Sequence, residues 1–316
     1  MTDDLEVALR AALAGARLGM SYFARVAEIS KERKPDGSLV TEADRAVEVA
    51  IREVISAERP ADAVLGEEGG LHGTAARRWI VDPIDGTAGF AAGDDRWLNL
   101  VALEVDGQVV VAVATVPAQN LIWYAQRGAG AFVAELTDAG TAGAGRSSDE
   151  GARPEPAKAG TAGAGRSSDE GARSEPAKAG TAGAGRSSDE GARPEPAKAG
   201  TAGARRISVS DRADVAASRF GVVPEPAATP EDGWIVAGLS AVTKPLPWSV
   251  HPALLVASGE LDLAVQTRGM VWDYAAPSLI VTEAGGRFSD HTGPAVYAAT
   301  GALHQAARDL MPGAPS

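Results

Sequence analysis

A block of repeated sequence limits what this chain can fold into. The 20-residue run AGTAGAGRSSDEGARPEPAK begins at Ala139, recurs with one change at Ala159, recurs again at Ala179, and starts a partial copy at Ala199. Each copy contains no aliphatic or aromatic side chain larger than alanine, and three basic side chains balance three acidic ones. A stacked repeat needs an apolar face to bury, so the block predicts a disordered insert rather than a solenoid. We expect a tolerated surface-loop insertion without a function of its own.

The insert divides the chain into two ordered parts. The expected boundaries are an N-terminal α+β part at 1–134, the insert at 135–204 and a C-terminal α/β part at 205–316. Without the insert about 250 residues remain, which suits one large domain or a close pair of subdomains. The periodicity predicts a helix pair, then a meander of strands, then alternating helices and strands. This order is typical of a layered sandwich of the α+β class.

Local signals place several elements. Apolar positions at helical spacing predict a helix from Leu5 to about Glu32. Thr41, followed three residues later by Asp44, fits a helix N-cap with an acidic first turn. The dipeptide at 106–107, Asp-Gly, stands between two β-branched runs and predicts a hairpin. A further helix should begin near Asp273 and end at the Gly-Gly pair at 285–286.

Charge and composition exclude several kinds of partner and site. The 316 residues carry a formal net charge of −12, which gives no electrostatic footprint for nucleic acid or an anionic membrane. The chain has no cysteine, so disulfides and thiolate metal sites are excluded, and its four histidines are scattered. Any metal site must therefore be built from oxygen, which favours magnesium, manganese or calcium. Without a signal peptide or a membrane-spanning stretch, we expect a cytoplasmic protein.

Acidic residues follow the predicted apolar elements at Asp44, Glu67 with Glu68, Asp82 with Asp85, and Asp273. Any one of them alone can be a helix cap or a solvated turn. The run WIVDPIDGTAGF at 79–90 is more restrictive, because a proline fixes the backbone between two acids that repel unless a cation lies between them. The Gly-Thr pair that follows opens a predicted helix, whose free N–H groups suit a phosphate. Carboxylates and amide donors together are what metal-assisted phosphoryl transfer requires.

These motifs give the sequence a resemblance to a known family. It resembles the inositol monophosphatase family of magnesium-dependent, lithium-sensitive phosphatases. Four motifs occur in the family's order and span the chain apart from the insert: KPDGSLVTEADRAVE, GEEGG, WIVDPIDGTAGF and VWDYAAPSLIVTEAGG. The resemblance implies an αβαβα sandwich of the inositol monophosphatase and fructose bisphosphatase type.

The resemblance also implies roles for individual residues. Two to three Mg²⁺ ions would be held by Glu67, Asp82, the backbone carbonyl of Ile84, Asp85 and Asp273. Thr87 with Asp44 would position and deprotonate the attacking water, and Glu67 would serve catalysis through a weaker third ion. The N–H groups of Gly86 and Thr87 would hold the phosphate. In this interpretation the acids lie together because they share metal ions, and no covalent phosphoenzyme forms.

Three departures from the family pattern bear on the substrate. Gly89 stands where the family has an asparagine, and Gln266 stands where a glutamate contacts substrate hydroxyls. We expect Gln266 to bind substrate through hydrogen bonds without charge. The run KPLPWSVHPALL replaces a small-residue pattern, and its Trp248 and His251 are expected to pack.

The sequence thus predicts a phosphomonoesterase for a small polyol phosphate, with inositol monophosphate first. Histidinol phosphate is the alternative, followed by a nucleotide or sugar bisphosphate. A non-catalytic homologue is the rival from another class, although no predicted metal ligand is lost. A small phosphate ester is the expected partner, with no nucleic acid and no membrane, and a homodimer is possible.

Overall fold

The computed structural model describes residues 3–35, 37–137, 200–224, 229–290 and 294–311. Most of the repeat block predicted as an insert, from 138 to 199, lies outside the described residues. Over the residues that are described, every helix is too short or too polar to cross a lipid bilayer.

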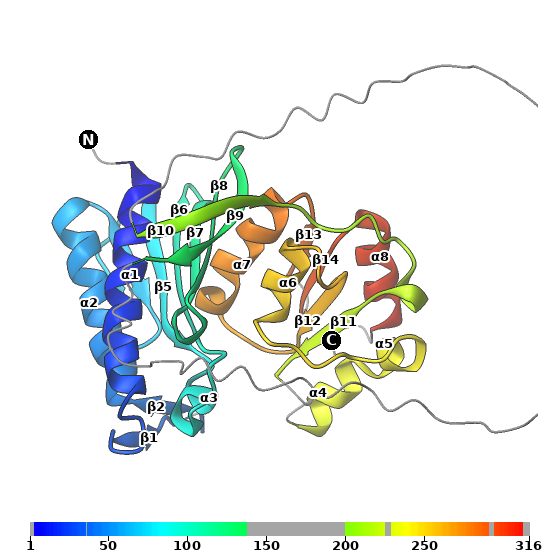
Figure 1. Cartoon of the computed structure of the whole chain (residues 1–316), viewed down its shortest axis with the longest axis horizontal. Coiled ribbons are helices and arrows are strands. Elements are labelled where there is room, and N and C mark those ends of the chain that lie inside the picture. Colours follow the sequence, from blue (N-terminus) through cyan, green and yellow to red (C-terminus); the bar gives the residue numbers. More distant parts are fainter. Residues whose placement is uncertain (1–2, 36, 138–199, 225–228, 291–293, 312–316) are drawn as a thin grey trace, which may run out of the picture. The chain divides into compact units, whose positions relative to one another are not determined.

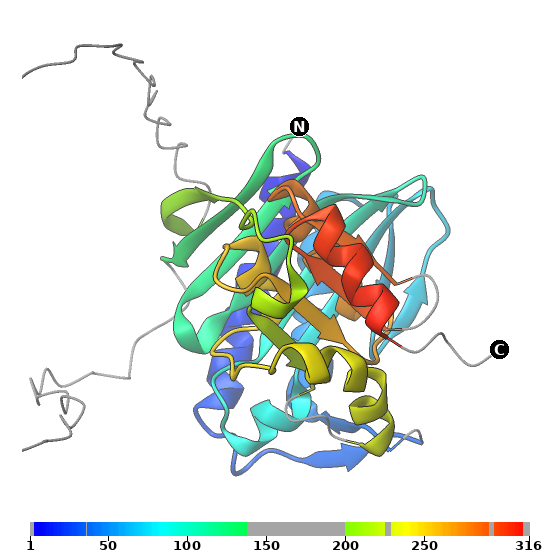
Figure 2. The ribbon, with the colours of Figure 1, turned by 90° about the vertical axis from the view of Figure 1, so that its right-hand side faces the viewer.

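Helices and two sheets alternate in layers (Figures 1 and 2). Helices α1 (Asp4–Phe23) and α2 (Glu42–Glu58) cover one face of an eight-stranded sheet. Helices α6 (Pro252–Ala257) and α7 (Val271–Glu283) lie between that sheet and a four-stranded sheet, and α8 (Gly301–Leu310) covers the outer face of the second sheet. This is the predicted αβαβα sandwich.

The large sheet has the strand order β10-β9-β8-β7-β6-β5-β3-β4, and only β3 and β5 run parallel. Its strands are β3 (Ala63–Gly66), β4 (Gly70–His72), β5 (Arg77–Asp85), β6 (Leu98–Val105), β7 (Gln108–Val116), β8 (Leu121–Gln126), β9 (Gly130–Leu136) and β10 (Thr201–Ile207). The dipeptide at 106–107 closes the β6–β7 hairpin with both residues at positive φ, as its sequence predicts.

The small sheet has the order β11-β12-β14-β13, with β11 (Phe220–Val223), β12 (Leu263–Gln266), β13 (Arg287–Ser289) and β14 (Ala295–Ala298). The remaining elements are the β1 (Lys31–Arg33) and β2 (Leu39–Thr41) ribbon, the short helices α3 (Thr87–Ala92), α4 (Pro230–Ile235) and α5 (Ala237–Val242), and the 3₁₀ turns η1 (Pro117–Gln119) and η2 (Val215–Ala217).

Strand β6 shows why the large sheet is buried on both faces. Leu100 and Ala102 belong to the apolar cluster formed with α6 and α7, whereas Val101 and Leu103 belong to the cluster formed with α1 and α2. Successive side chains of a strand point to opposite faces, so an unbroken apolar run fills two cores at once. A polar residue within such a run is therefore buried and needs a hydrogen-bond partner inside the protein.

The N-terminal helix is shorter than its periodicity predicts. Helix α1 ends at Phe23, and residues 24–30 form turns before β1 rather than continuing the helix to Glu32. The Phe23 ring packs against Phe90 and Trp97, with ring centroids 5.5 and 5.8 Å away. Positions beyond it are mostly exposed, so no apolar stripe remains to continue the helix.

Strand β10 begins inside the stretch that was assigned to the insert. Thr201 pairs with Leu136 of β9, and the N–H of Thr137 donates to the carbonyl of Gly200 at 3.0 Å. A β-bulge between Ala202 and Arg205, with Gly203 at positive φ, accommodates this small-residue sequence. The chain on the two sides of the insert thus meets at one edge of the sheet.

Candidate metal centre

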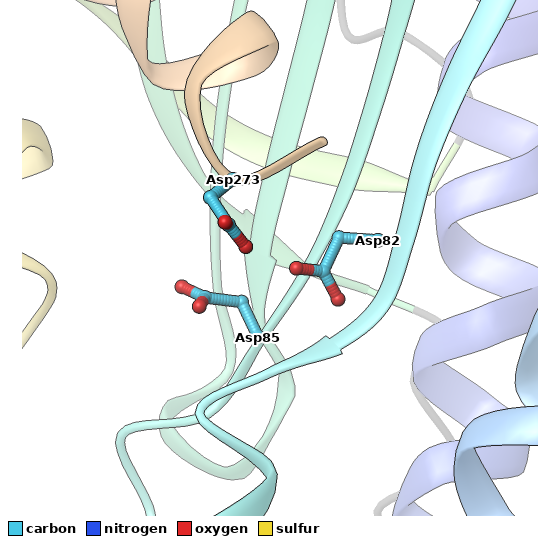
Figure 3. A group of neighbouring side chains, drawn as sticks. All are labelled: Asp82, Asp85 and Asp273. Atoms are coloured by element: carbon cyan, nitrogen blue, oxygen red, sulfur yellow. The ribbon is translucent and has the colours of Figure 1, made fainter. Parts of the chain in front are cut away.

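A β-bulge in β5 turns Asp82 and Asp85 to the same side. Residues three apart on a regular strand point to opposite faces. Here Asp82 pairs with Leu100 and Asp85 pairs with Leu98, so two residues of β5 lie opposite the single residue between those partners. The extra residue restores a shared face for the two carboxylates, and both reach toward the start of α7 (Figure 3).

Two buried polar side chains anchor the bulge. The Asn99 side-chain amide donates to the carbonyl of Pro83, and the Thr115 hydroxyl donates to Asn99 Oδ1 at 3.1 Å. Asn99 and Thr115 are cross-strand partners on β6 and β7, and both are fully buried. The sequence analysis missed them. The available signal was one amide and one hydroxyl inside otherwise apolar strands.

Asp273 adds the third carboxylate from the C-terminal part of the chain. It lies in the first turn of α7, where it accepts the backbone N–H of Met270 as a helix cap. One oxygen from each of Asp82, Asp85 and Asp273 lies within 4.8 Å of the others. Asp273 therefore caps α7 and also reaches the other two aspartates, and its role as a metal ligand stays a prediction.

The negative charges of this group are poorly compensated by the surrounding protein. Burial, reinforced by the neighbouring carboxylates, raises the pKa of Asp82 well above its usual value and that of Asp85 to about 8. Among the described residues no basic side chain forms an ion pair with Asp82, Asp85 or Asp273, and Asp82 Oδ1 is buried without a hydrogen-bond partner. A divalent ion held by these oxygens would offset the repulsion between the carboxylates and give Asp82 Oδ1 a partner. The residues therefore fit a hard metal ion.

Glu67 lies in the turn after β3 and is not part of the group of three aspartates whose oxygens lie within 4.8 Å of one another. Its N–H donates to the carbonyl of Val81 at 3.2 Å, and its charge raises the pKa of Asp82 and Asp85. The Lys34 ammonium lies 2.8 Å from Glu67 Oε1 and 2.6 Å from Glu68 Oε1. Burial raises the pKa of Glu67 and Lys34 opposes the shift. The sequence analysis gave this lysine no role.

Asp44 and Thr87 meet as expected. Asp44 Oδ1 accepts the Thr87 hydroxyl at 2.9 Å, and Oδ2 accepts the N–H and hydroxyl of Thr41 at 2.8 and 2.6 Å. The carbonyl of Ile84 lies 3.0 Å from the same Thr87 oxygen. Burial raises the pKa of Asp44 despite these hydrogen bonds. Asp44, the acidic residue of the predicted cap of α2, thus also hydrogen-bonds to the first residue of α3.

Comparison with known proteins decides the family. A model of the inositol monophosphatase family matches residues 1–170 and 223–314. The chain belongs to this family. A histidinol-phosphatase of Mycobacterium tuberculosis is 33% identical over 320 residues, covering 96% of this chain and 95% of that one. An inositol-1-monophosphatase of Rhizobium meliloti is 42% identical over 113 residues, covering 35% of this chain and 42% of that one.

Solved structures confirm the fold of this inositol monophosphatase family member. The extragenic suppressor protein suhB of Bartonella henselae superposes with a TM-score of 0.67 at 21% identity, with 96% of each chain covered. An IMPase of Thermotoga maritima gives a TM-score of 0.66 at 22% identity, covering 98% of this chain and 96% of that one.

The region around Gly89 shows how this family member fastens the loop after α3. A Cβ at Gly89 would lie 3.4 Å from the Cβ of Asp94, and the Asp94 N–H donates to the Gly89 carbonyl at 2.9 Å. A terminal nitrogen of the Arg96 guanidinium lies 2.6 Å from Asp94 Oδ2, and hydrogen bonds from Arg96 lower the pKa of Asp94. The Arg96 guanidinium also stacks over the ring of Trp248, 4.5 Å from its centroid. These contacts link the segment after α3 to Trp248.

The remaining predicted residues lie at different depths. Gly86 precedes α3 with φ +85°, a conformation that favours glycine, and the first-turn N–H groups of α3 have no acceptor within the helix.

Gln266 is buried at the end of β12, where it accepts the Tyr297 hydroxyl at 3.5 Å, and is not part of the acidic group. His251 is buried and its Nδ1 accepts the N–H of Ala253 at the start of α6, so it packs as expected.

Proposed function

We propose that this chain hydrolyses a small organic phosphate monoester at the centre formed by Asp82, Asp85 and Asp273. The observation that carries the proposal is the convergence of these three carboxylates within 4.8 Å, with the Asp44–Thr87 hydrogen bond on the same strand-to-helix connection. The broader prediction of a phosphoric monoester hydrolase is confirmed by membership of the inositol monophosphatase family and by the phosphatases among its relatives.

The proposed cofactor is Mg²⁺, as two to three ions. Asp82, Asp85, Asp273 and Glu67 would hold them with the carbonyl of Ile84. Bound there, the ions would neutralise phosphate charge, lower the pKa of a water molecule and stabilise the leaving oxygen. The orphaned oxygen of Asp82 and the raised pKa of Asp85 support this assignment, because both features disappear when a cation is shared.

The other proposed roles belong to side chains around α3. The Thr87 hydroxyl, which donates to Asp44 Oδ1, would accept a hydrogen bond from the attacking water and so orient it. As the water attacks, its proton would move to the Thr87 oxygen while the Thr87 proton moves to Asp44. The raised pKa of Asp44 suits a proton acceptor, since a stronger base takes the proton more readily. The N–H groups of Gly86 and Thr87 would bind the phosphate oxygens.

Histidinol phosphate and inositol monophosphate are the two candidate substrates. The sequence analysis placed inositol monophosphate first. Histidinol-phosphatases of Mycobacterium tuberculosis and Streptomyces coelicolor align over 95% and 94% of their own lengths, whereas the Rhizobium meliloti inositol-1-monophosphatase aligns over 42% of its length. The full-length similarity supports testing histidinol phosphate first. Lithium sensitivity, a cytoplasmic location and a homodimer remain parts of the proposal.

Phosphate release from a substrate panel tests the proposal. Histidinol phosphate, inositol-1-phosphate, fructose-1,6-bisphosphate and adenosine 3',5'-bisphosphate are each supplied with Mg²⁺, with EDTA, and with Mg²⁺ plus Li⁺. We expect Mg²⁺-dependent release from histidinol phosphate or inositol-1-phosphate and none in EDTA. Release from none of the four by a chain that binds Mg²⁺ would favour the non-catalytic interpretation.

Gln266→Glu tests the proposed substrate contact. The added charge should change the ratio of kcat/KM between histidinol phosphate and inositol-1-phosphate more than it changes the Mg²⁺ requirement. An unchanged ratio would mean that Gln266 does not contact the substrate.

A further inference from the structure

Glu48 lies under the turn that carries Glu67, and the proposed function does not use it. It follows Asp44 by one helical turn on α2 and is 2% exposed. Glu48 Oε2 accepts the N–H of Glu68 at 2.7 Å, and Oε1 accepts the N–H of Gly69 at 2.9 Å. One buried carboxylate therefore holds two consecutive backbone donors of the β3–β4 turn.

The turn approaches this carboxylate so closely that side chains are excluded. A Cβ at Gly66 would overlap the Glu48 carboxylate, and a Cβ at Gly69 would lie 2.7 Å from Glu48 Oε1. Neither glycine is among those at positive φ, so space rather than backbone conformation requires them. Gly66 and Gly69 of the GEEGG motif thus leave the space that the Glu48 carboxylate occupies.

Arg52 completes the support. Its Nε donates to Glu48 Oε1 at 2.7 Å, which balances the buried charge. Its two terminal nitrogens donate to the carbonyl of Val64 on β3 at 3.1 Å and to the carbonyl of Gly70 on β4 at 2.5 Å. Charge-assisted hydrogen bonds of this kind fix geometry strongly. Glu48 and Arg52 together hydrogen-bond to both strands of the β3–β4 hairpin and to the turn between them.

The held turn connects directly to the metal centre. The Glu67 N–H donates at 3.2 Å to the carbonyl of Val81, the residue before Asp82. We propose that Glu48 is a positioning residue that fixes Glu67 relative to Asp82 and thereby sets the affinity of the metal centre. This inference rests on the metal site of the proposed function.

Titration calorimetry with MgCl₂ on Glu48→Gln tests this role. The glutamine keeps the size of the side chain but faces one backbone N–H with its own donor group. We expect Mg²⁺ to bind about 10–100-fold more weakly, the range seen when groups supporting metal ligands are changed. At saturating Mg²⁺, kcat should stay within about threefold of the wild type, because the ligands themselves remain.

Asp262→Asn is the matched control. Asp262 is equally buried and is held by Ser210 and Arg219, but it touches no residue of the metal centre. We expect Asp262→Asn to lower Tm and leave Mg²⁺ binding unchanged. If Glu48→Gln lowers Tm to a similar extent and binds Mg²⁺ like the wild type, Glu48 only supports the fold and the proposal is wrong.

Gly69→Ala provides a second variant should Glu48→Gln not fold. It keeps the Glu48 charge and displaces the turn from it, so weaker Mg²⁺ binding is expected, and wild-type binding by the folded variant would overturn the proposal. Mg²⁺ binding by a wild-type chain that releases no phosphate from the panel would contradict the proposed function alone, because calorimetry still decides the role of Glu48.

Discussion

Asp262 and Asp82 are both buried carboxylates, but their surroundings shift their pKa values in opposite directions. Although burial opposes it, hydrogen bonds from Arg219 and Ser210 lower the pKa of Asp262 to about 2. Asp82 is as buried, yet burial and neighbouring acids raise its pKa and one of its oxygens has no partner. The fold compensates the charge of Asp262 with its own hydrogen bonds and does not compensate the charge of Asp82. Such uncompensated groups are typical of functional sites.

Asp85→Asn should show the largest effect on activity. Removing a proposed metal ligand should lower kcat/KM at least about 100-fold, since groups that merely support ligands already account for 10–100-fold. The Tm in EDTA at neutral pH should rise, because the amide is neutral in both states, whereas burial and the charge of Asp273 force Asp85 to take up a proton on folding. Phosphate release and thermal unfolding measure the two effects. Activity above a tenth of the wild type would break the contrast with Asp262, whose asparagine variant should stay active.

Asn99→Leu should have the next largest effect. It leaves the carbonyl of Pro83 buried without its donor, which costs about 1–3 kcal/mol, and releases the bulge that aims Asp82 and Asp85. We expect kcat/KM to fall about 10-fold or more, as for other changes to groups that support metal ligands. Thr115→Val keeps the Asn99 donor in place and is the control. An unchanged kcat/KM in Asn99→Leu would show that the bulge is held by the strand ladder instead.

Metal removal should make stability depend on pH in a defined direction. The proton is favoured on folded Asp85, whose pKa is about 8 against a usual value of 3.8, so without metal the free energy of unfolding should fall as pH rises from 4 to 8. Each net pKa unit corresponds to about 1.4 kcal/mol, or about 3–6 °C in Tm for a chain of this size.

Thermal unfolding in EDTA and in saturating Mg²⁺ measures this dependence. Bound metal should remove the loss. Asp262 contributes in the other direction, since its stabilisation is present above pH 3.8 and is lost as pH falls toward 2. A Tm in EDTA that is flat from pH 5 to 8 would contradict the uncompensated charge at Asp85.

His251 should give the smallest effect and extends the comparison to a buried base. Burial lowers its pKa from 6.5 to about 4, so the neutral ring is favoured in the folded state. Stability should therefore be complete above pH 6.5 and decline toward pH 4, by about 3 kcal/mol at most. His251→Asn keeps an acceptor for the helix N–H and should show less of this decline in Tm. The same decline in the variant would assign it to other groups.

The parts of the site that were predictable from sequence depend on local signals. A few adjacent residues determine each of three features: the Thr41–Asp44 cap, the turn at 85–87 and the helix that begins near Asp273. The capping box appears in the structure with both of its hydrogen bonds. Local chemistry of this kind survives folding because each partner lies within one turn of the other.

The missed residues act across the sheet or between elements. Asn99 supports Pro83 only because the β5–β6 register places them opposite each other. Glu48 reaches Glu68 and Gly69 only because α2 packs against β5, the strand that pairs with β3. The length of α1 likewise depends on where Phe23 finds its aromatic partners. Periodicity and spacing contain no information on such contacts.

The pairing of β9 with β10 has a consequence for how this gene can vary. The strands join residues 137 and 200 in one hydrogen-bonded register, and three strands separate β9 from β5. Lengthening a chain segment whose ends are already joined costs only about 0.6 kcal/mol per doubling. Copies of the repeat can therefore be gained or lost in whole units during evolution, as a nearly neutral length polymorphism, while Asp82, Asp85 and Asp273 keep their positions.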